Sequence, residues 1–162
     1  MLITANIQPI IPAYDSKIAS IIRTVLEEFG ANRPGTVYTD PTTDHLSQVF
    51  QHPGAGYFVV EQQGTVLGGA GFYPTAGLPE LTCELVKMYL LPSARGKGIG
   101  LRLLQHVMAT ALQSGYSQMY IETMPELQRA IQLYEKAGFR RLTQPMGDSG
   151  HFGCDIWMLR DL

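Results

Sequence analysis

Apolar residues recur along the chain with two spacings, which divide it into predicted helices and strands. Between residues 18 and 29 they return every three or four positions, and this spacing predicts an amphipathic helix. Asp15 or Ser16 is expected to cap its start, and Gly30 is expected to end it. The same spacing predicts a second, longer helix from residue 99 to Gly115.

A third helix is predicted toward the end of the chain. Its apolar face is formed by Leu127, Ala130, Ile131 and Tyr134, and Gly138 follows it. The preceding Thr123-Met124-Pro125-Glu126 has the sequence of a capping box, so we expect these residues to begin the helix.

Shorter apolar runs bounded by turn residues predict strands. They cover residues 2–10, 57–61, 66–72, 81–90, 117–122, 139–142 and 154–159. The early strands follow one another through turns such as Gln63-Gly64, whereas the later strands alternate with helices. This order predicts an α/β or α+β fold with a mixed sheet, formed by residues 1–162 as a single domain.

Two segments of the chain are irregular. Residues 30–56 are rich in proline and glycine, with a short helical pattern at Leu46, Val49 and Phe50. Such a segment is either a plain connector or a loop that faces a substrate, and the sequence leaves both interpretations open. A second long loop is expected over residues 144–151.

Composition and charge narrow the range of functions. Hydrophobic residues make up 45% of the 162 positions, an ordinary value for a globular domain, and charged residues only 16%. The formal net charge is −2 and the basic residues are scattered, so we expect no nucleic-acid partner. No apolar run approaches the ~20 residues of a membrane span, and no basic region precedes the first apolar run. We therefore expect a cytoplasmic protein without a signal peptide or a membrane partner.

Cysteine and histidine usage gives no sign of a metal centre. Cys83 and Cys154 stand too far apart for a zinc motif and make no disulfide framework, so we interpret them as buried free thiols. The four histidines form no close pair along the sequence. We therefore expect no metal.

The most informative segment is Arg95-Gly96-Lys97-Gly98-Ile99-Gly100, which joins a predicted strand to a predicted helix. Glycines let the backbone approach a ligand closely, and a helix N-terminus presents N–H groups with partial positive charge, so this turn is suited to phosphate. It lacks the Gly-x-x-x-x-Gly-Lys-Ser/Thr pattern of a P-loop. A dinucleotide site with Glu122 on the ribose stays open, although the glycines alternate and follow an antiparallel meander. The remaining interpretation is the pyrophosphate of a different cofactor.

Three segments together support one family. Arg95–Gly100 fits the pattern Gln/Arg-x-x-Gly-x-Gly/Ala, and residues 133–139 read Leu-Tyr-Glu-Lys-Ala-Gly-Phe. Glu84-Leu85-x-x-Met88-x-Leu90-x-Pro92 precedes the turn. In these segments and in element order the chain resembles the GNAT superfamily of N-acetyltransferases. The resemblance implies the acyl-CoA N-acyltransferase fold, a mostly antiparallel sheet of about six to seven strands flanked by helices. Residues 147–154 also resemble the acetyltransferase half of bacterial proteins that carry a MarR-type regulator.

The resemblance implies acetyl-CoA as co-substrate and direct transfer of acetyl from the thioester to a primary amine of a small molecule or peptide. The backbone of residues 96–101 would hold the CoA pyrophosphate, with Arg95 and Lys97 adding charge nearby. The pantetheine arm would pair with the backbone of Met88 and Leu90, and the Met88 N–H would stabilise the oxyanion. The implied cofactor-binding residues are Met88, Tyr89, Leu90, Arg95, Gly96, Lys97, Gly98, Ile99, Gly100 and Leu101.

Two side chains are implied in catalysis. Tyr134 matches a general acid that protonates the departing CoA thiolate, although a core tyrosine would fit the same helix face. Glu84 matches a general base for the acceptor amine; it would also fit a partner of Lys87, or a carboxylate that binds the substrate ammonium without taking its proton. Many relatives carry an asparagine that contacts the pantetheine at the position of Leu127. Leucine cannot make this polar contact, so we do not expect it in this chain.

The acceptor side is implied only in outline. Residues 30–53 and the loop 144–153 would form its walls, with Phe29, Tyr38, Asp148 and His151 as candidates, and the low charge suits a small amine. The resemblance allows a homodimer. The alternative function is a non-catalytic acyl-CoA-binding or regulatory module on the same fold.

Overall fold

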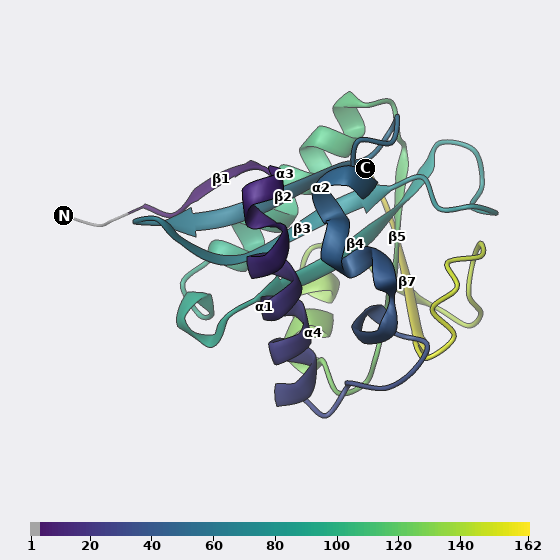
Figure 1. The fold of residues 1–162 in the computed structure, drawn as a ribbon. Helices are drawn as coiled ribbons and strands as arrows, with labels where there is room; N and C mark the ends of the chain where they lie inside the picture. Colours follow the sequence, from purple (N-terminus) through teal and green to yellow (C-terminus); the bar gives the residue numbers. More distant parts are fainter. Residues whose placement is uncertain (1–3) are drawn as a thin grey trace.

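The computed structural model describes residues 4–162, in which seven strands and four α-helices are arranged around one sheet (Figure 1). The strands are β1 (Asn6–Pro9), β2 (Gly56–Gln62), β3 (Thr65–Tyr73), β4 (Thr82–Leu90), β5 (Gln118–Thr123), β6 (Arg140–Leu142) and β7 (Ile156–Asp161). The α-helices are α1 (Asp15–Glu28), α2 (Leu46–Val49), α3 (Ile99–Gln113) and α4 (Gln128–Lys136). The start of the strand predicted over residues 2–10 lies outside the described residues.

The strands lie side by side in the order β1-β2-β3-β4-β5-β7-β6. Only β4 and β5 are parallel, and the other neighbouring pairs of the described sheet are antiparallel. The mixed, mostly antiparallel sheet predicted from the sequence is therefore confirmed.

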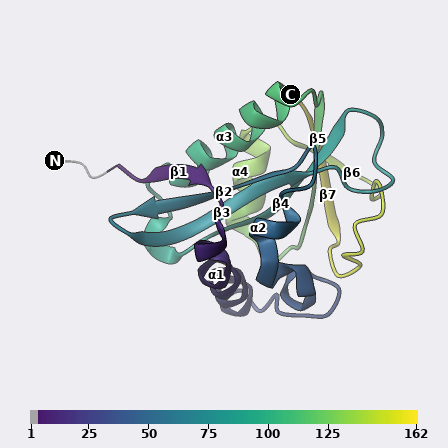
Figure 2. The same ribbon diagram turned by 45° about the horizontal axis from the view of Figure 1, so that its top comes forward.

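Helices cover both faces of this sheet. Phe58 and Val60 of β2 pack with α3 and α4 on one face, whereas Tyr57 and Val59 pack with α1 and α2 on the other. Figure 2 shows α3 and α4 on the upper side of the sheet and α1 and α2 below it. Because successive side chains of a strand point to opposite faces, β2 has a continuous apolar run rather than an alternating one.

The predicted start of the last helix is wrong. Thr123 is the final residue of β5, and α4 begins at Gln128 after Leu127, with no side-chain cap. The Glu126 carboxylate instead accepts a hydrogen bond from Arg33, 2.6 Å away. An ionised partner distant in sequence has displaced the local cap.

The predicted capping role of Asp15 is also wrong. Asp15 is the first residue of α1, which has no side-chain cap. Its carboxylate accepts a hydrogen bond from the Ser47 N–H of α2 at 2.8 Å and another from the Ser47 hydroxyl. Asp15 therefore holds the irregular segment after α1 against the start of that helix.

Two further observations concern the whole described chain. Cys83 and Cys154 are both free thiols, the first buried and the second half-buried. Among residues 4–162, no helix combines the length and the apolar character needed to cross a membrane.

Candidate active site

A bulge in β4 shapes the site. The register between β3 and β4 shifts between Gly69 and Gly71, where β4 gains one residue. Lys87 lies in this bulge with a φ of 52°, a conformation that side chains rarely adopt. The buried Tyr57 hydroxyl donates a hydrogen bond to the Lys87 carbonyl at 2.8 Å. The Tyr57 side chain, on the sheet face that α1 and α2 cover, therefore holds the bulge in place.

A glycine in β3 lets the backbone of β4 come close to β3 next to the bulge. A Cβ atom on Gly68, which has a φ of 152°, would lie 2.1 Å from the Tyr89 carbonyl oxygen. No other residue fits there without moving the backbone. The glycine run of β3 is thus the local sequence signal for the bulge.

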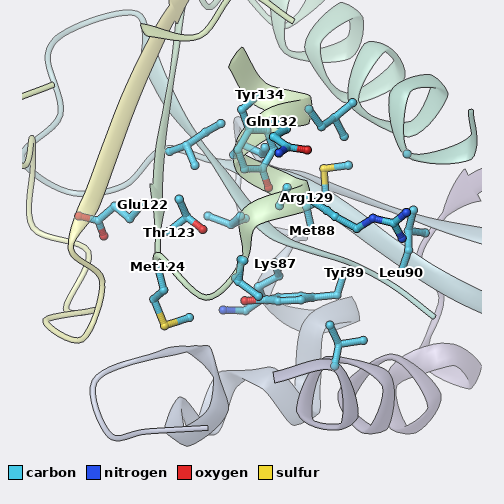
Figure 3. Close-up of a pocket in the computed structure, with 18 of the residues that line it drawn as sticks. Lys87, Met88, Tyr89, Leu90, Glu122, Thr123, Met124, Arg129, Gln132 and Tyr134 are labelled. Carbon is cyan, nitrogen blue, oxygen red and sulfur yellow. The ribbon is translucent and has the colours of Figure 1, made fainter. Parts of the chain in front are cut away.

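Where the bulge begins, β4 and β5 separate. Their pairing ends at Leu85 and Ile121, although β4 continues to Leu90 and β5 to Thr123. A pocket with a volume of about 520 Å³ opens between them. Figure 3 shows Lys87–Leu90 on one side of it and Glu122–Met124 on another. The freed backbone edge of β4 is available to an extended ligand.

The glycine turn closes one end of this pocket. Gly96 and Gly98 have φ values of 72° and 75°, and a Cβ on either would meet no atom within 4 Å, so the turn is open to a ligand. The backbone bonds of α3 begin with the Arg102 N–H, which donates to the Gly98 carbonyl at 3.1 Å. The N–H groups of residues 99–101 precede this bond and are free to bind an anion. The turn therefore fits a pyrophosphate.

The side chains of the turn have separate roles. Ile99 packs into the core, so only its backbone faces the turn, and Lys97 is exposed outside the pocket lining. Arg95 lines the pocket, but its guanidinium forms two bonds to Glu28, at 2.8 and 2.9 Å. Its Nε also donates to the Leu90 carbonyl at 3.0 Å, which ties the turn to β4.

Tyr134 of α4 reaches the pocket wall (Figure 3). The residue is only 5% exposed, and its ring packs edge-on against Phe139, 5.9 Å away. Burial raises the pKa of its phenol, so the hydroxyl is protonated throughout the neutral range. Tyr134 is therefore both a core residue and a potential proton donor.

Glu84 of β4 is 3% exposed and lines the same pocket. Its carboxylate accepts a hydrogen bond from the Thr75 hydroxyl at 2.7 Å. Burial, and then the negative charge of Glu122, raise its pKa to about 7, against the opposing effects of Thr75, His151 and Lys87. A carboxyl group with a pKa near neutrality is well matched to general-base chemistry.

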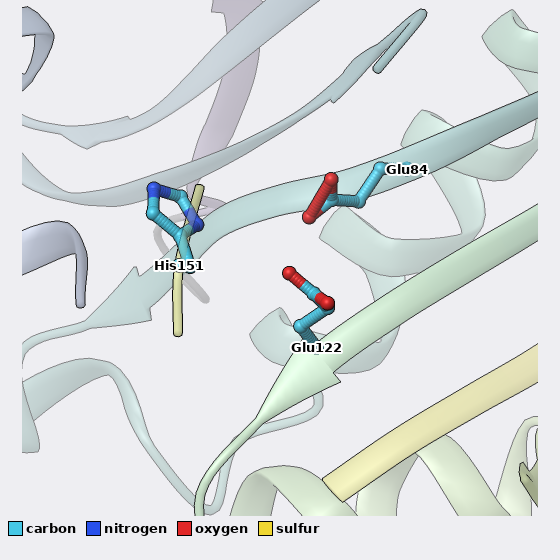
Figure 4. A group of neighbouring side chains, drawn as sticks. All are labelled: Glu84, Glu122 and His151. Carbon is cyan, nitrogen blue, oxygen red and sulfur yellow. The ribbon is translucent and has the colours of Figure 1, made fainter. Parts of the chain in front are cut away.

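Glu84, Glu122 and His151 form a cluster that sequence reasoning missed. Their ligand atoms lie within 4.8 Å of one another, and Figure 4 shows the two carboxylates facing each other beside the histidine ring. The three donors come from β4, β5 and the loop 144–153, so they lie far apart in the sequence and form no local motif. The geometry could hold a cation, and the absence of a metal stays a prediction.

Asp40 links both irregular segments to the pocket. Its carboxylate lies 3.1 Å from His151 Nε2 and 3.4 Å from Lys87 Nζ. His151, with help from Thr42 and Lys87, holds the pKa of Asp40 well below its usual range. Residues 30–56 are therefore more than a connector, because Asp40 binds two side chains that line the pocket.

The four acceptor candidates separate into two groups. Phe29 and His151 line the pocket. Tyr38 donates a hydrogen bond to Glu27 at 2.6 Å and lies outside the lining, as does Asp148, whose N–H donates to the Ala76 carbonyl.

Comparisons with known proteins agree with this fold. The family model described as acetyltransferase (GNAT) family matches residues 20–139. The uncharacterized N-acetyltransferase YjgM of Escherichia coli K12 is 42% identical over 146 residues, which cover 90% of this chain and 87% of that protein.

Solved structures share the fold. A GNAT-family acetyltransferase from Staphylococcus aureus Mu50 superposes with a TM-score of 0.83 at 18% identity, covering 98% of this chain and 99% of that one. The protein yncA from Salmonella typhimurium, solved with its cofactor acetyl-CoA, has a TM-score of 0.74 at 23% identity, and the match covers 98% of this chain and 94% of that one. The chain belongs to the GNAT family of acetyltransferases, and the protein is an acyltransferase.

Proposed function

We propose that the protein transfers acetyl directly from acetyl-CoA to a primary amine of a small acceptor. The observation that carries this proposal is the continuity of the pocket, which runs from the glycine turn along the freed edge of β4 to the Glu84 carboxyl. A phosphate cradle, a slot for an extended arm and a carboxyl with a pKa near neutrality thus lie in one cavity.

In this proposal the backbone binds the co-substrate. N–H groups of residues 96–101 bind the pyrophosphate, and the edge of β4 at Met88, Tyr89 and Leu90 pairs with the pantetheine arm. Met88 has no register partner in β3 or β5, so its N–H is suited to stabilise the thioester oxygen as negative charge develops.

Two side chains then move protons. Glu84 accepts a proton from the acceptor ammonium, which frees the nitrogen lone pair for attack on the thioester carbon. Tyr134 donates a proton to the sulfur as the carbon–sulfur bond breaks, so that CoA leaves as the thiol, and the second proton that the nitrogen loses on becoming an amide restores the Tyr134 phenol.

The test is release of free thiol from acetyl-CoA with a panel of alkylamines, diamines, amino sugars and amino acids. We expect turnover with at least one amine, and a loss of two or more orders of magnitude in Glu84→Gln, as is typical when a general base is removed. Glu80→Gln is the matched control, because this exposed glutamate precedes the same strand and lies outside the pocket. Binding of acetyl-CoA without thiol release from any amine would instead support the non-catalytic module.

A further inference from the structure

The acceptor end of the pocket, bounded by Glu84, Glu122 and His151, has an unusual balance of charge. Both carboxylates are hydrogen-bonded only by neutral hydroxyls, from Thr75 to Glu84 at 2.7 Å and from Tyr120 and Ser149 to Glu122. Within residues 4–162, neither carboxylate has a basic group within the 4.0 Å of an ion pair. The two carboxyl groups therefore face the cavity without an ion pair of their own, although His151 lies within 4.8 Å of both.

The basic groups near this end already have carboxylate partners. Lys87 and His151 both bind Asp40, at 3.4 and 3.1 Å. Arg33, behind the late loop, binds Glu126 at 2.6 Å and Asp155 at 3.7 Å.

The pocket lining also contains Arg95, Arg129 and Lys136. Arg95 is bound to Glu28, and Lys136 is exposed in the last turn of α4. In Figure 3 the Arg129 side chain points away from Glu122, which lies on the opposite side of the pocket. None of the three is placed to neutralise an acidic group beside Glu84.

We propose that the acceptor end binds an ammonium group between Glu84 and Glu122 and discriminates against acceptors that carry a carboxylate next to the reacting amine. The inference rests on the proposed function and names its substrate class: amines without an α-carboxylate, such as alkylamines, diamines or amino sugars. An α-amino acid would bring its own carboxylate against two carboxylates in a mostly buried site, with no free cation to receive it.

A matched set of three acceptors tests this class. Norleucine, norleucinamide and 1-aminopentane share one alkyl chain and differ in a carboxylate, a neutral amide of the same shape or a hydrogen. Initial rates with saturating acetyl-CoA are compared at equal concentrations of the protonated amine, because the proposed site binds the ammonium form and the three amines differ in basicity. We expect kcat/KM for the amide and the alkylamine to exceed that of norleucine by at least about tenfold, since like charges repel strongly at this range.

Two variants change the charge balance in the same direction. Glu122→Gln removes one carboxylate, and Asp40→Asn releases Lys87 and His151 from their partner, so both reduce the discrimination against norleucine. Asp44→Asn is the control: it lies in the same segment as Asp40 but is exposed and bound to Arg23 at 2.6 Å. It leaves the ratio unchanged.

Each other outcome overturns the inference. If norleucine is acetylated as well as norleucinamide, the inference fails while the proposed amine acetylation stands. If none of the three compounds and no amine of the wider panel releases thiol although acetyl-CoA binds, both fail. If removal of divalent metals abolishes turnover and added zinc restores it, the three donors hold a metal rather than an ammonium.

Discussion

The protonation of Glu84 makes the sharpest prediction. Burial and the neighbouring Glu122 raise the pKa of Glu84 from 4.5 to about 7. Because the base must be ionised to accept a proton, kcat measured at saturating substrates should rise with pH through about 7 and then level off. Replacing Glu122 with glutamine removes the facing negative charge and should move this midpoint to lower pH.

The size of the effect follows from the geometry. The facing atoms of the two carboxyls lie within 4.8 Å, where unit charges interact by ~3.5 kcal/mol at an effective dielectric constant of about 20 and by ~0.9 kcal/mol in water. Burial is the larger cause of the raised pKa, so we expect a value between these limits, about one pKa unit for Glu122→Gln. The opposing groups, Lys87 and His151, are retained in that variant.

The same shift predicts a pH dependence of stability. Between pH 4.5 and about 7 the unfolded chain has lost the Glu84 proton while the folded chain retains it, so ionisation favours unfolding and stability falls as pH rises. The rise in the pKa of Glu84 from 4.5 to about 7 corresponds to about 3 kcal/mol in the free energy of unfolding. Wild type should lose this amount of stability between pH 4.5 and about 7, whereas Glu84→Gln, which cannot ionise at this position, should not. Below pH 4.5 and above about 7 this group contributes no slope.

Two assays check the reasoning. The pH profile of thiol release gives the midpoint for wild type and Glu122→Gln, and urea titrations across the same pH range give the stability of wild type, Glu84→Gln and the exposed Glu80→Gln. A midpoint that Glu122→Gln leaves in place would refute the charge coupling. A wild-type stability curve parallel to that of Glu84→Gln would refute the raised pKa.

Three further predictions concern single residues. Tyr134→Phe should lower kcat by about ten- to a hundredfold in thiol-release assays and leave the Kd for acetyl-CoA, measured by calorimetry, unchanged. Tyr116→Phe should change neither value, because Tyr116 is bound to the Gly54 carbonyl outside the pocket. Full activity in Tyr134→Phe would exclude the acid role. Gly98→Val should weaken acetyl-CoA binding in calorimetry by at least about tenfold. Gly64 lies in the β2–β3 turn with a φ of 79°, close to the 75° of Gly98, so Gly64→Val should lower stability without weakening binding. Equal Kd values for the two variants would count against the Gly96–Gly100 turn as the phosphate site. Gly68→Ala should lower the free energy of unfolding by roughly 3 kcal/mol or more, because the new Cβ would lie 2.1 Å from the Tyr89 carbonyl oxygen. The Cβ of Gly64→Ala meets no atom within 4 Å, so this variant should lower the free energy of unfolding by about 1 kcal/mol. Similar melting temperatures for the two variants would show that the backbone near the bulge shifts to accept the Cβ.

Local signals predicted the elements well and their ends less well. The stripe within residues 18–29 became α1, and the glycine turn did begin α3. The capping pattern at Thr123–Glu126 failed because Glu126 bonds to Arg33, which is 93 positions away along the chain. A side chain that could cap a helix can instead bind a charged group brought to it by the tertiary structure. Arg33 lies too far away in the sequence for a local pattern to show this interaction.

The candidate site divides in the same way. The glycine turn was found from its residue pattern, and Glu84 and Tyr134 were found through the family resemblance, since each belongs to a short ordered segment. Asp40 was not found as a site residue, and Glu122 was considered only as a ribose ligand of a dinucleotide site, because the importance of both comes from neighbours on other elements. Parallel pairing of β4 with β5 brings Glu122 to Glu84, and α1 with the segment after it brings Asp40 to Lys87 and His151.

By itself the sequence determined whatever depends on backbone conformation and periodicity. Positive φ at Gly96 and Gly98, and the helix that follows, make an anion cradle wherever the chain folds locally in this way. The tertiary structure decided the chemistry opposite that cradle. A carboxyl group changes its pKa and its preference for a ligand through burial and through charges a few ångströms away, and only packing sets those distances.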